Sequence, residues 1–551
     1  MTQPQHLSLA PSAAVLVTAP LLYALGGVFG QLARLHRLSV ARAWTIVRAV
    51  SLASILLALA LCADALFSWR TLRAGAQVST IAHLGIVTLS FRMDLLTVLM
   101  LTLVTFLGWV ITNYSRSYMS GDPAEQRYLP YLMGTLAAVS LLLVTNNLLL
   151  FLAAWVLTSL SLHGLLTLYQ HRQAALIAAH KKFLASRMGD LTLLCAVLLL
   201  GTGAHSFEMD KILENVTRLH PVPTAMHLAA VLLAISAAVK CAQLPLHGWL
   251  IQVMEAPTPI SALLHAGVVN LGGFMLIRLA GVLNTTPAAQ TLLVILGSLT
   301  ATLSALVMTT RISIKVQLAW STCAQMGFML MECGLGLYHL ALLHLLAHSL
   351  YKAHAFLSSG GTVALARLKQ MQPPTPATSA SAWMVGTLLG VFAALFGAWL
   401  WHTHLQFDAS AYTCILIVGL AIAGALANAL ATRTLAATLP LAAGLLAISA
   451  LYFGLEQFFA AVVPQTVTQS QWHRAAFVAF CFALLALMQA LVRIHPLGAV
   501  ATALYPWFYA GLYMDELFTR TTFRVWPARP ARDAALRRDA MQPYQQRGAA
   551  Q

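Results

Sequence analysis

Charged side chains are scarce in this sequence: only 9% of its 551 residues are Asp, Glu, Lys or Arg, whereas 59% are hydrophobic. Soluble domains carry about 25% charged residues. Acidic residues are the scarcer kind, with 16 against 32 basic ones, which gives a formal net charge of +16. Because the basic residues are spread over short loops and a C-terminal tail, the composition excludes a soluble domain and a nucleic-acid partner, and favours a protein of the lipid bilayer.

Paired cysteine motifs and a leader sequence are also missing. The seven cysteines form no CxxC pair, and each lies in an apolar stretch, so we interpret them as small packing residues. The polar segment before Pro11 has no positively charged region of the kind that begins a signal peptide. We therefore expect neither disulfides nor a cleaved signal.

Long apolar runs dominate instead, and a helical span needs about 20 such residues. The pattern predicts an all-α polytopic membrane protein with about 15 transmembrane helices, at 11–30, 44–67, 93–113, 128–145, 147–169, 183–202, 224–245, 257–281, 289–309, 313–333, 337–360, 382–403, 411–432, 437–462 and 474–494. Lys and Arg concentrate on alternate loops, beginning with Arg34 and Arg37, and in the tail. This asymmetry predicts an N-terminus outside and a C-terminus in the cytoplasm.

The stretch from Lys240 to Gly273 places a lysine in an apolar run, followed by His247, Glu255 and His265. Prolines interrupt helical hydrogen bonding within it, at Pro245, Pro257 and Pro259. Broken helix at membrane depth is tolerated only where it lines protein or water. Because ionisable residues inside spans are functional by default, this stretch indicates a path for protons or other ions. The alternative is a lysine that snorkels from a helix end.

The eleventh span carries His344, His348 and Lys352 at positions i, i+4 and i+8, which stacks them on one helix face. Neutral histidine both donates and accepts, and it titrates near neutral pH, so such a row can relay protons. A His-x3-His pair also suits zinc. No cysteine or carboxylate completes a zinc site, and Lys352 would repel a cation, so we expect no metal and no cofactor in this chain.

A buried lysine that switches charge needs an acidic neighbour. Asp190, at the start of the sixth span, is the best candidate for Lys240 in the sequence. Glu255 is a second possible partner, whereas Glu332 and Asp64 lie near helix ends and are weaker.

Five stretches resemble the antiporter-like membrane subunits of respiratory complex I, chain 5 above all, and of Mrp-type antiporters. They read AAHKKFLASRMGD, KCAQLPLHGWL, EAPTPISALLHAG, IKVQLAWSTCAQMGFML and LHLLAHSLYKAHAFLSSG, and the resemblance covers roughly residues 85–365. It implies two inverted five-helix repeats, each with a broken helix, and the family's proton-path residues at Lys240, His265, His344, His348 and Lys352.

The same resemblance suggests a division of the chain. The predicted parts of the chain are three N-terminal helices (1–127), a first repeat (128–281), a second repeat (289–432), two C-terminal helices (437–494), and a cytoplasmic amphipathic segment with a basic tail (498–551). Residues 371–381 have the composition of a flexible linker.

The departures from the family pattern are specific. Val156 stands where the fifth span normally carries a glutamate, and Asn146 stands for an aspartate. The twelfth span lacks its usual lysine, since no lysine follows Lys369, and the chain has no room for a long lateral helix after its last span.

This combination resembles the DabB family, the membrane subunits of the DAB inorganic-carbon accumulation system. The resemblance implies a bacterial inner-membrane subunit that couples an ion gradient, with protons favoured over sodium, to CO2 or bicarbonate uptake. It also implies a large cytoplasmic partner, DabA-like and similar to a zinc β-carbonic anhydrase, that holds the zinc and performs the hydration. Two alternatives remain: a pump or antiporter subunit of a complex I-like or Mrp-like assembly, and a scaffold that only anchors its partner.

Overall fold

The computed structural model describes residues 11–68, 77–84, 87–170, 172–218, 221–362, 366–368, 371, 378–401, 409–432, 435–463 and 472–526. This part of the chain is helical apart from one antiparallel β-hairpin and short connections. Twelve of its helices are long and apolar enough to cross a membrane. The prediction of an all-α polytopic membrane protein is confirmed.

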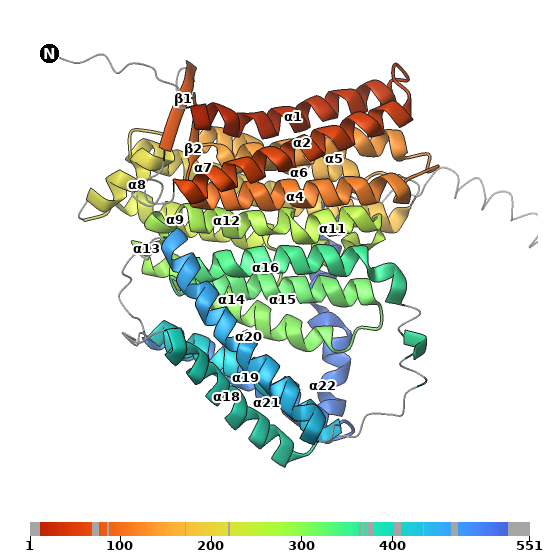
Figure 1. The fold of residues 1–551 in the computed structure, drawn as a ribbon, viewed down its shortest axis with the longest axis vertical. Helices are drawn as coiled ribbons and strands as arrows, with labels where there is room; N and C mark the ends of the chain where they lie inside the picture. Colours follow the sequence, from red (N-terminus) through yellow and green to blue (C-terminus); the bar gives the residue numbers. More distant parts are fainter. Residues whose placement is uncertain are drawn as a thin grey trace, which may run out of the picture.

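The N-terminal part consists of α1 (Pro11–Arg34), α2 (Val40–Phe67), β1 (Gln77–Leu84), β2 (Val87–Met93) and α4 (Leu95–Tyr118). The strands pair antiparallel, with Gln77 opposite Met93. Asp94 caps α4, because its side chain accepts a hydrogen bond from the backbone N–H of Thr97. In Figure 1 the hairpin lies at the left ends of the long helices, and we call this side of the molecule the hairpin side.

The next part holds α5 (Glu125–Val144), α6 (Leu148–Leu166), α7 (Gln173–Gly203), α8 (Met209–Arg218), α9 (Thr224–Lys240), α10 (Gly248–Gln252), η1 (Val253–Glu255), α11 (Thr258–Ala266), η2 (Val268–Asn270) and α12 (Leu271–Arg278). Helix α7 begins ten residues before the predicted start of the sixth span. The preceding segment, QAALIAAHKK, is rich in alanine and lysine, which are good helix formers, whereas its Gln, His and Lys side chains lower its hydropathy.

The second half holds α13 (Ala280–Asn284), α14 (Pro287–Met308), α15 (Ile314–Gly334), α16 (Tyr338–Leu357), η3 (Ser359–Gly361), α18 (Ala380–Trp401), α19 (Ala409–Thr432), α20 (Leu435–Val462) and α21 (Trp472–Ile494). Every predicted span coincides with described helix. Three of them, α9, α15 and α16, are not among the twelve apolar candidates. Helix α9 has only 17 residues, and α16 carries the predicted row of histidines and a lysine.

Two consecutive helical segments of the first half are interrupted inside the protein. Helix α9 ends at Lys240, and seven residues containing Pro245 separate it from α10. The second interruption lies between α11 and α12, at η2. Pro257 and Pro259 do not break a helix; they flank the first residue of α11, where a missing N–H costs nothing. In the second half, α18 is continuous from Ala380 to Trp401, and residues 402–408 lie outside the described ranges.

Helices α14 and α15 approach closely enough to bring two glycines against the opposite backbone. A Cβ on Gly327 would lie 2.7 Å from the carbonyl oxygen of Gly297, and a Cβ on Gly297 would lie 2.6 Å from the carbonyl oxygen of Gly327. Small residues at such crossings allow the close packing on which helix association in membranes depends.

The chain ends, as far as it is described, with α22 (Ala499–Tyr509), η4 (Gly511–Tyr513) and α23 (Met514–Val525). Helix α22 lies at the right of Figure 1, and we call this the opposite side. The described part of the predicted 498–551 segment is therefore mainly helical. The basic tail after Trp526, most of the 371–381 linker and the segment before Pro11 lie outside the described residues.

Candidate functional site

The end of α9 brings a lysine into the protein interior. Lys240 is 8% exposed, and its Nζ lies 4.3 Å from the ring centre of Trp155 on α6, in cation–π geometry. Within the described residues its Nζ has no hydrogen-bond partner. Trp155 directly precedes Val156, the position at which the family pattern has its glutamate, so this part of α6 presents an aromatic face rather than an acid to Lys240.

A second group of charges lies on α7, facing the same region. Arg187 and Asp190 form an ion pair of 2.6 Å one helical turn apart. Nζ of Lys182 donates to the carbonyl oxygen of Ser159 at 2.6 Å and to its hydroxyl at 3.0 Å. Asp190 is close enough to Lys240 and Lys182 for its charge to act on both ammonium groups. The structure thus places Asp190 where a charge partner of Lys240 is needed.

A small cavity joins these two groups. Its volume is about 10 Å³, and Trp155, Lys182, Gly189, Lys240 and Trp249 are among its lining residues. A cavity of that size has room for about one water molecule. Water in such a place can carry a proton between a lysine on α7 and a lysine on α9.

Polar contacts continue from the end of α9 toward α16. The thiol of Cys241 donates to the carbonyl oxygen of Val269, 3.2 Å away, in the interruption between α11 and α12. The next residue, Asn270, donates from Nδ2 to the Ser349 hydroxyl on α16 at 2.7 Å and to the carbonyl oxygen of Ala266 at 3.0 Å. Interrupted helix leaves backbone carbonyls unpaired, and the bonds from Cys241 to Val269 and from Asn270 to Ser349 cross between helices at the break.

Helix α16 carries the predicted row of titratable groups, and the structure adds contacts from other helices to each member of the row. His348 contacts the backbone of His265 on α11, and Nδ1 of His344 lies 3.1 Å from Oε2 of Glu332 on α15. His265 is fully buried, stacks on Phe356, and has no partner among the described residues for either ring nitrogen. Nζ of Lys352, also fully buried, donates to the carbonyl oxygen of Leu318 at 3.1 Å.

Glu332 was the weaker candidate by sequence, because it lies near a helix end. It is 2% exposed and faces α16. A cavity of about 360 Å³ between α15, α16 and α20 is lined by Glu332 and His344 together with Phe328, Leu340 and Tyr452. The sequence signal was available, since an acid in an otherwise apolar span is uncommon, but only the packing of α15 on α16 identifies its partner.

The remaining predicted residues lie apart from this row. His247, in the break before α10, is buried, and its ring packs 4.7 Å from that of Trp320. Glu255 is exposed, and the described residues include no ion-pair partner for it. The structure therefore does not bring Glu255 to Lys240.

No cluster suited to a metal ion is present in the described ranges. Nowhere in these ranges do three or more His, Cys, Asp or Glu side chains lie together. The His344–His348 pair has its ring centres 6.2 Å apart, and its acidic neighbour is a single carboxylate.

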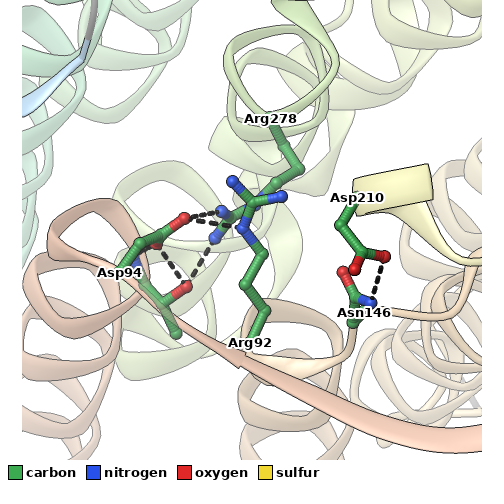
Figure 2. Close-up of polar contacts among 6 residues, drawn as sticks. Arg92, Asp94, Asn146, Asp210 and Arg278 are labelled. Carbon is green, nitrogen blue, oxygen red and sulfur yellow. Dashed lines mark hydrogen bonds and ion pairs between the residues drawn. The ribbon is translucent and has the colours of Figure 1, made fainter. Parts of the chain in front are cut away.

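Two further polar contacts lie on the hairpin side (Figure 2). Arg278, the last residue of α12, and Arg92 of β2 both converge on Asp94, and Arg278 also donates to the Thr97 hydroxyl at 2.5 Å. Burial alone would raise the pKa of the Asp94 carboxyl, but the two arginines lower the pKa of Asp94 well below its usual range. This ion pair ties the end of the interrupted α11–α12 segment to the start of α4.

The second contact concerns a departure from the family pattern. Nδ2 of Asn146 donates to Oδ1 of Asp210 on α8 at 2.7 Å, as Figure 2 shows. The acid that the resemblance implies at position 146 is therefore supplied from another element, across 64 residues of sequence.

Interrupted helices with a buried lysine, and a histidine row on the helix beside them, define an antiporter-like membrane subunit. The family model for "NADH:quinone oxidoreductase/Mrp antiporter, TM" matches residues 145–424, and the one for the N-terminus of complex I chain 5 matches residues 82–129. The chain belongs to this antiporter-like family. It is a multi-pass membrane protein.

Inorganic-carbon transporter subunits are similar to this chain over most of its length. The chain is 37% identical over 488 residues to the "Probable inorganic carbon transporter subunit DabB" of Hydrogenovibrio crunogenus. The aligned region covers 88% of this chain and 90% of that protein. It is 37% identical to the corresponding DabB2 of Halothiobacillus neapolitanus over 82% of this chain and 83% of that protein. The match to NADH-ubiquinone oxidoreductase chain 5 of Metridium senile, at 36% identity, covers 49% of this chain and 45% of that protein.

Solved structures share the fold. The Mrp complex from Dietzia sp. DQ12-45-1b matches with a TM-score of 0.58 at 21% identity, over 98% of this chain and 60% of that one. The membrane-bound sulfane sulfur reductase, an archaeal respiratory membrane complex, matches with a TM-score of 0.57 at 14% identity, over 93% of this chain and 99% of that one.

Proposed function

We propose that this protein is the ion-translocating, energy-coupling membrane subunit of an inorganic-carbon uptake complex. The observation that carries the proposal is the row of contacts from Glu332 through His344 and His348 to His265. It runs across three helices, is buried, and meets interrupted backbone at one end. Burying titratable groups inside a membrane protein costs free energy, so their presence there indicates a function. The similarity to DabB proteins, which extends over most of the chain, supports the carbon-uptake assignment.

The proposed path begins on the hairpin side, which the distribution of basic residues assigns to the outside. A proton passes the Arg187–Asp190 pair and reaches Lys240 near Trp155. It continues along the interruption at Asn270 to His265, which contacts His348, the middle member of the row formed by His344, His348 and Lys352. Protons are favoured over sodium, because the groups in the row are mainly histidine and lysine, which bind protons rather than metal cations.

The glutamate missing at Val156 and the lysine missing from the twelfth span suit a coupling subunit that differs from a complete respiratory pump. Asp190 takes the place of the absent glutamate at Val156 as the acid near Lys240. In the second half, the described α18 contains no lysine, and Glu332 supplies the charged group that contacts the histidine row.

A large cytoplasmic partner similar to a zinc β-carbonic anhydrase completes the proposed complex. The partner would hold the zinc and hydrate CO2 to bicarbonate, so this chain transports and is not itself the enzyme. The α22–α23 segment lies on the side assigned to the cytoplasm, where such a partner would bind.

Purification of the tagged chain in mild detergent, with mass spectrometry and metal analysis, tests this assignment. We expect one large soluble companion that contains zinc, and we expect the two genes together, but neither alone, to restore growth in air to a carbonic-anhydrase-deficient bacterium. Co-purification of several antiporter-like subunits with flavin or iron–sulfur proteins would contradict the proposal.

That second result would favour the runner-up function, a proton-pumping or cation/proton antiporter subunit of a respiratory or Mrp-like assembly. The observation in its favour is the match to chain 5 and to Mrp structures. The third candidate, a scaffold that only anchors its partner, would not need the buried His and Lys groups. Substitution of Lys240 tests this candidate directly, because a scaffold would keep its function without the lysine.

A further inference from the structure

The C-terminal helices dock against the break that follows Lys240. Phe508 of α22, Leu512 of η4 and Met514 of α23 pack beside Leu244, in the break, and Trp320 of α15. Nη2 of Arg311 donates to the carbonyl oxygen of Phe508 at 2.9 Å. Residues from the end of the described chain thus contact both repeats on the opposite side.

This docking brings the carboxylate of Asp515, whose side chain is 32% exposed, against α7 and α10 beside the break. Oδ1 and Oδ2 of Asp515 lie 2.9 Å and 3.1 Å from Nζ of Lys181, whose side chain is fully buried. Oδ2 also accepts a hydrogen bond of 2.8 Å from Nε2 of Gln252 in α10. The position that faces Asp515 is Gly248, where an added Cβ would lie 1.5 Å from Oδ1, so no larger residue fits while Asp515 is docked.

The turn before Asp515 is built to aim it. Gly511, Leu512 and Tyr513 have φ values of +65°, +62° and +57°, and left-handed backbone is unfavourable for the two non-glycine residues. Packing holds them there: Gly511 lies against Trp320 and Arg311, where a Cβ would be 3.2 Å from the indole. A turn that only reversed the chain would not require two strained residues.

Asp515 lies at the end of a run of polar atoms that need partners. In the described part of the chain, five buried side-chain atoms between 240 and 252 have no hydrogen-bond partner: Nζ of Lys240, Oε1 of Gln243, Nε2 of His247, Nε1 of Trp249 and Oε1 of Gln252. Buried polar groups are satisfied by protein, water or an ion, so such a run marks a route for water or protons. The carboxylate of Asp515 interacts electrostatically with His247, which is one of the residues in this run.

We propose that Asp515 is a proton-transferring carboxylate of the path, supplied by α23 to the break after Lys240, and that Lys181 positions it. It connects Lys240, by way of His247, to the side on which α22 and α23 lie. The inference rests on the proposed function, because it assigns the residue through which the path of the first half reaches that side.

The test uses the complete complex in the carbonic-anhydrase-deficient cells and measures accumulation of labelled inorganic carbon, together with thermal stability of the detergent-solubilised complex. Asp515→Asn should lower accumulation about tenfold or more, since a positioned proton-transfer group contributes about 100-fold in rate. The matched control is Glu516→Gln. Glu516 is the next residue, is exposed, and among the described residues forms an ion pair with Arg520 alone, at 2.6 Å, so its loss should not change accumulation.

A double variant separates proton transfer from charge balance. Asp515→Asn alone leaves Lys181 as an unpaired buried charge, whereas Lys181→Met/Asp515→Asn removes both charges and should restore stability. We expect this double variant to be as stable as the wild type and still inactive. Recovery of carbon accumulation in the double variant would show that Asp515 only balances the charge of Lys181, and would overturn the proposal.

Lys240→Met distinguishes failure of this proposal from failure of the proposed function. If Lys240→Met abolishes accumulation while Asp515→Asn leaves it normal, Asp515 is excluded from the path and the function stands. If both variants accumulate carbon normally, the proposed function itself is wrong, and the role of Asp515 is wrong with it.

Discussion

Nε2 of His348 lies 3.3 Å from the backbone carbonyl oxygen of His265, 83 residues earlier in the chain. A carbonyl oxygen only accepts, so His348 donates from Nε2, and in its neutral form its Nδ1 is an acceptor. At the next position in the row, Nδ1 of His344 faces a carboxylate oxygen of Glu332 and donates to it. The two contacts set the tautomers of both rings, and a relay requires such defined donors and acceptors.

His348→Gln should abolish carbon accumulation without unfolding the protein. Glutamine can still donate a hydrogen bond to the carbonyl oxygen of His265, but it cannot bind or release a proton near neutral pH. The matched control is His354→Gln, on the same helix, because His354 is exposed. Equal accumulation in His348→Gln and His354→Gln would remove His348 from the path.

Glu332→Gln tests whether the acid of the second half is functional. The amide oxygen can still accept from Nδ1 of His344, but the negative charge that stabilises a protonated imidazole is lost. We expect accumulation to fall more than about tenfold, on the scale of a lost proton-transfer group. The exposed Glu255 provides the control, and Glu255→Gln should accumulate carbon at the wild-type rate. If Glu332→Gln matches this control, the Glu332–His344 contact is structural.

Asp94→Asn should destabilise the protein in a pH-dependent way. Removing one partner of a buried ion pair costs about 3–5 kcal/mol, here by leaving Arg278 without its carboxylate. The folded-state pKa of Asp94 lies below its unfolded value of about 3.9, so the ion pair stabilises the fold above that pH and its contribution is lost as the pH falls toward the folded-state value.

Melting temperatures of wild type and Asp94→Asn in detergent check this sign. The gap between them should be widest at neutral pH and should narrow below about pH 4. Exposed Asp64 on α2 supplies the control, and Asp64→Asn should melt like the wild type at every pH. A gap that widens on acidification would show that Asp94 is not held ionised by the arginines.

Gly327→Val should separate α14 from α15. A Cβ at this position meets backbone atoms of Ala301 and Gly297 at 2.7 Å, and backbone cannot move aside as a flexible side chain can. Overpacking of this kind costs about 1–3 kcal/mol or more, and a lowered melting temperature would show it. Gly444→Val is the control, because nothing lies within 4 Å of an added Cβ there. Equal melting temperatures for the two variants would contradict the close crossing of α14 and α15.

Much of the architecture is predictable from sequence, because a bilayer imposes a simple length and hydropathy rule. All fifteen predicted spans coincide with helices, and even the break after Lys240 follows from Pro245. The rule fails where helix extends beyond the apolar run, as α7 does at Gln173, since propensity and hydropathy then disagree. Pro257 and Pro259, predicted as breaks, lie at the boundary between η1 and α11 and flank the first residue of α11.

The site was only partly predictable, because its remaining contacts join residues distant in sequence. The row His344, His348 and Lys352 follows from helical spacing, and Asp190 from the scarcity of acids. In contrast, the partner of Glu332 depends on how α15 packs on α16, and no spacing rule relates Asp515 to Lys181, 334 residues earlier. Trp155 was unrecognised for the same reason, since tryptophan in an apolar span gives no signal of a buried lysine.

The most direct test of the account is accumulation of labelled inorganic carbon by cells that express the complex with Lys240→Met or Lys352→Met, with assembly verified by co-purification of the partner. Lys211→Met, which removes an exposed lysine on the hairpin side, is the control. If the buried lysines carry the ion that drives uptake, both variants assemble and neither accumulates carbon above cells without the complex, while the control accumulates it normally. Wild-type accumulation in both buried-lysine variants would contradict the account.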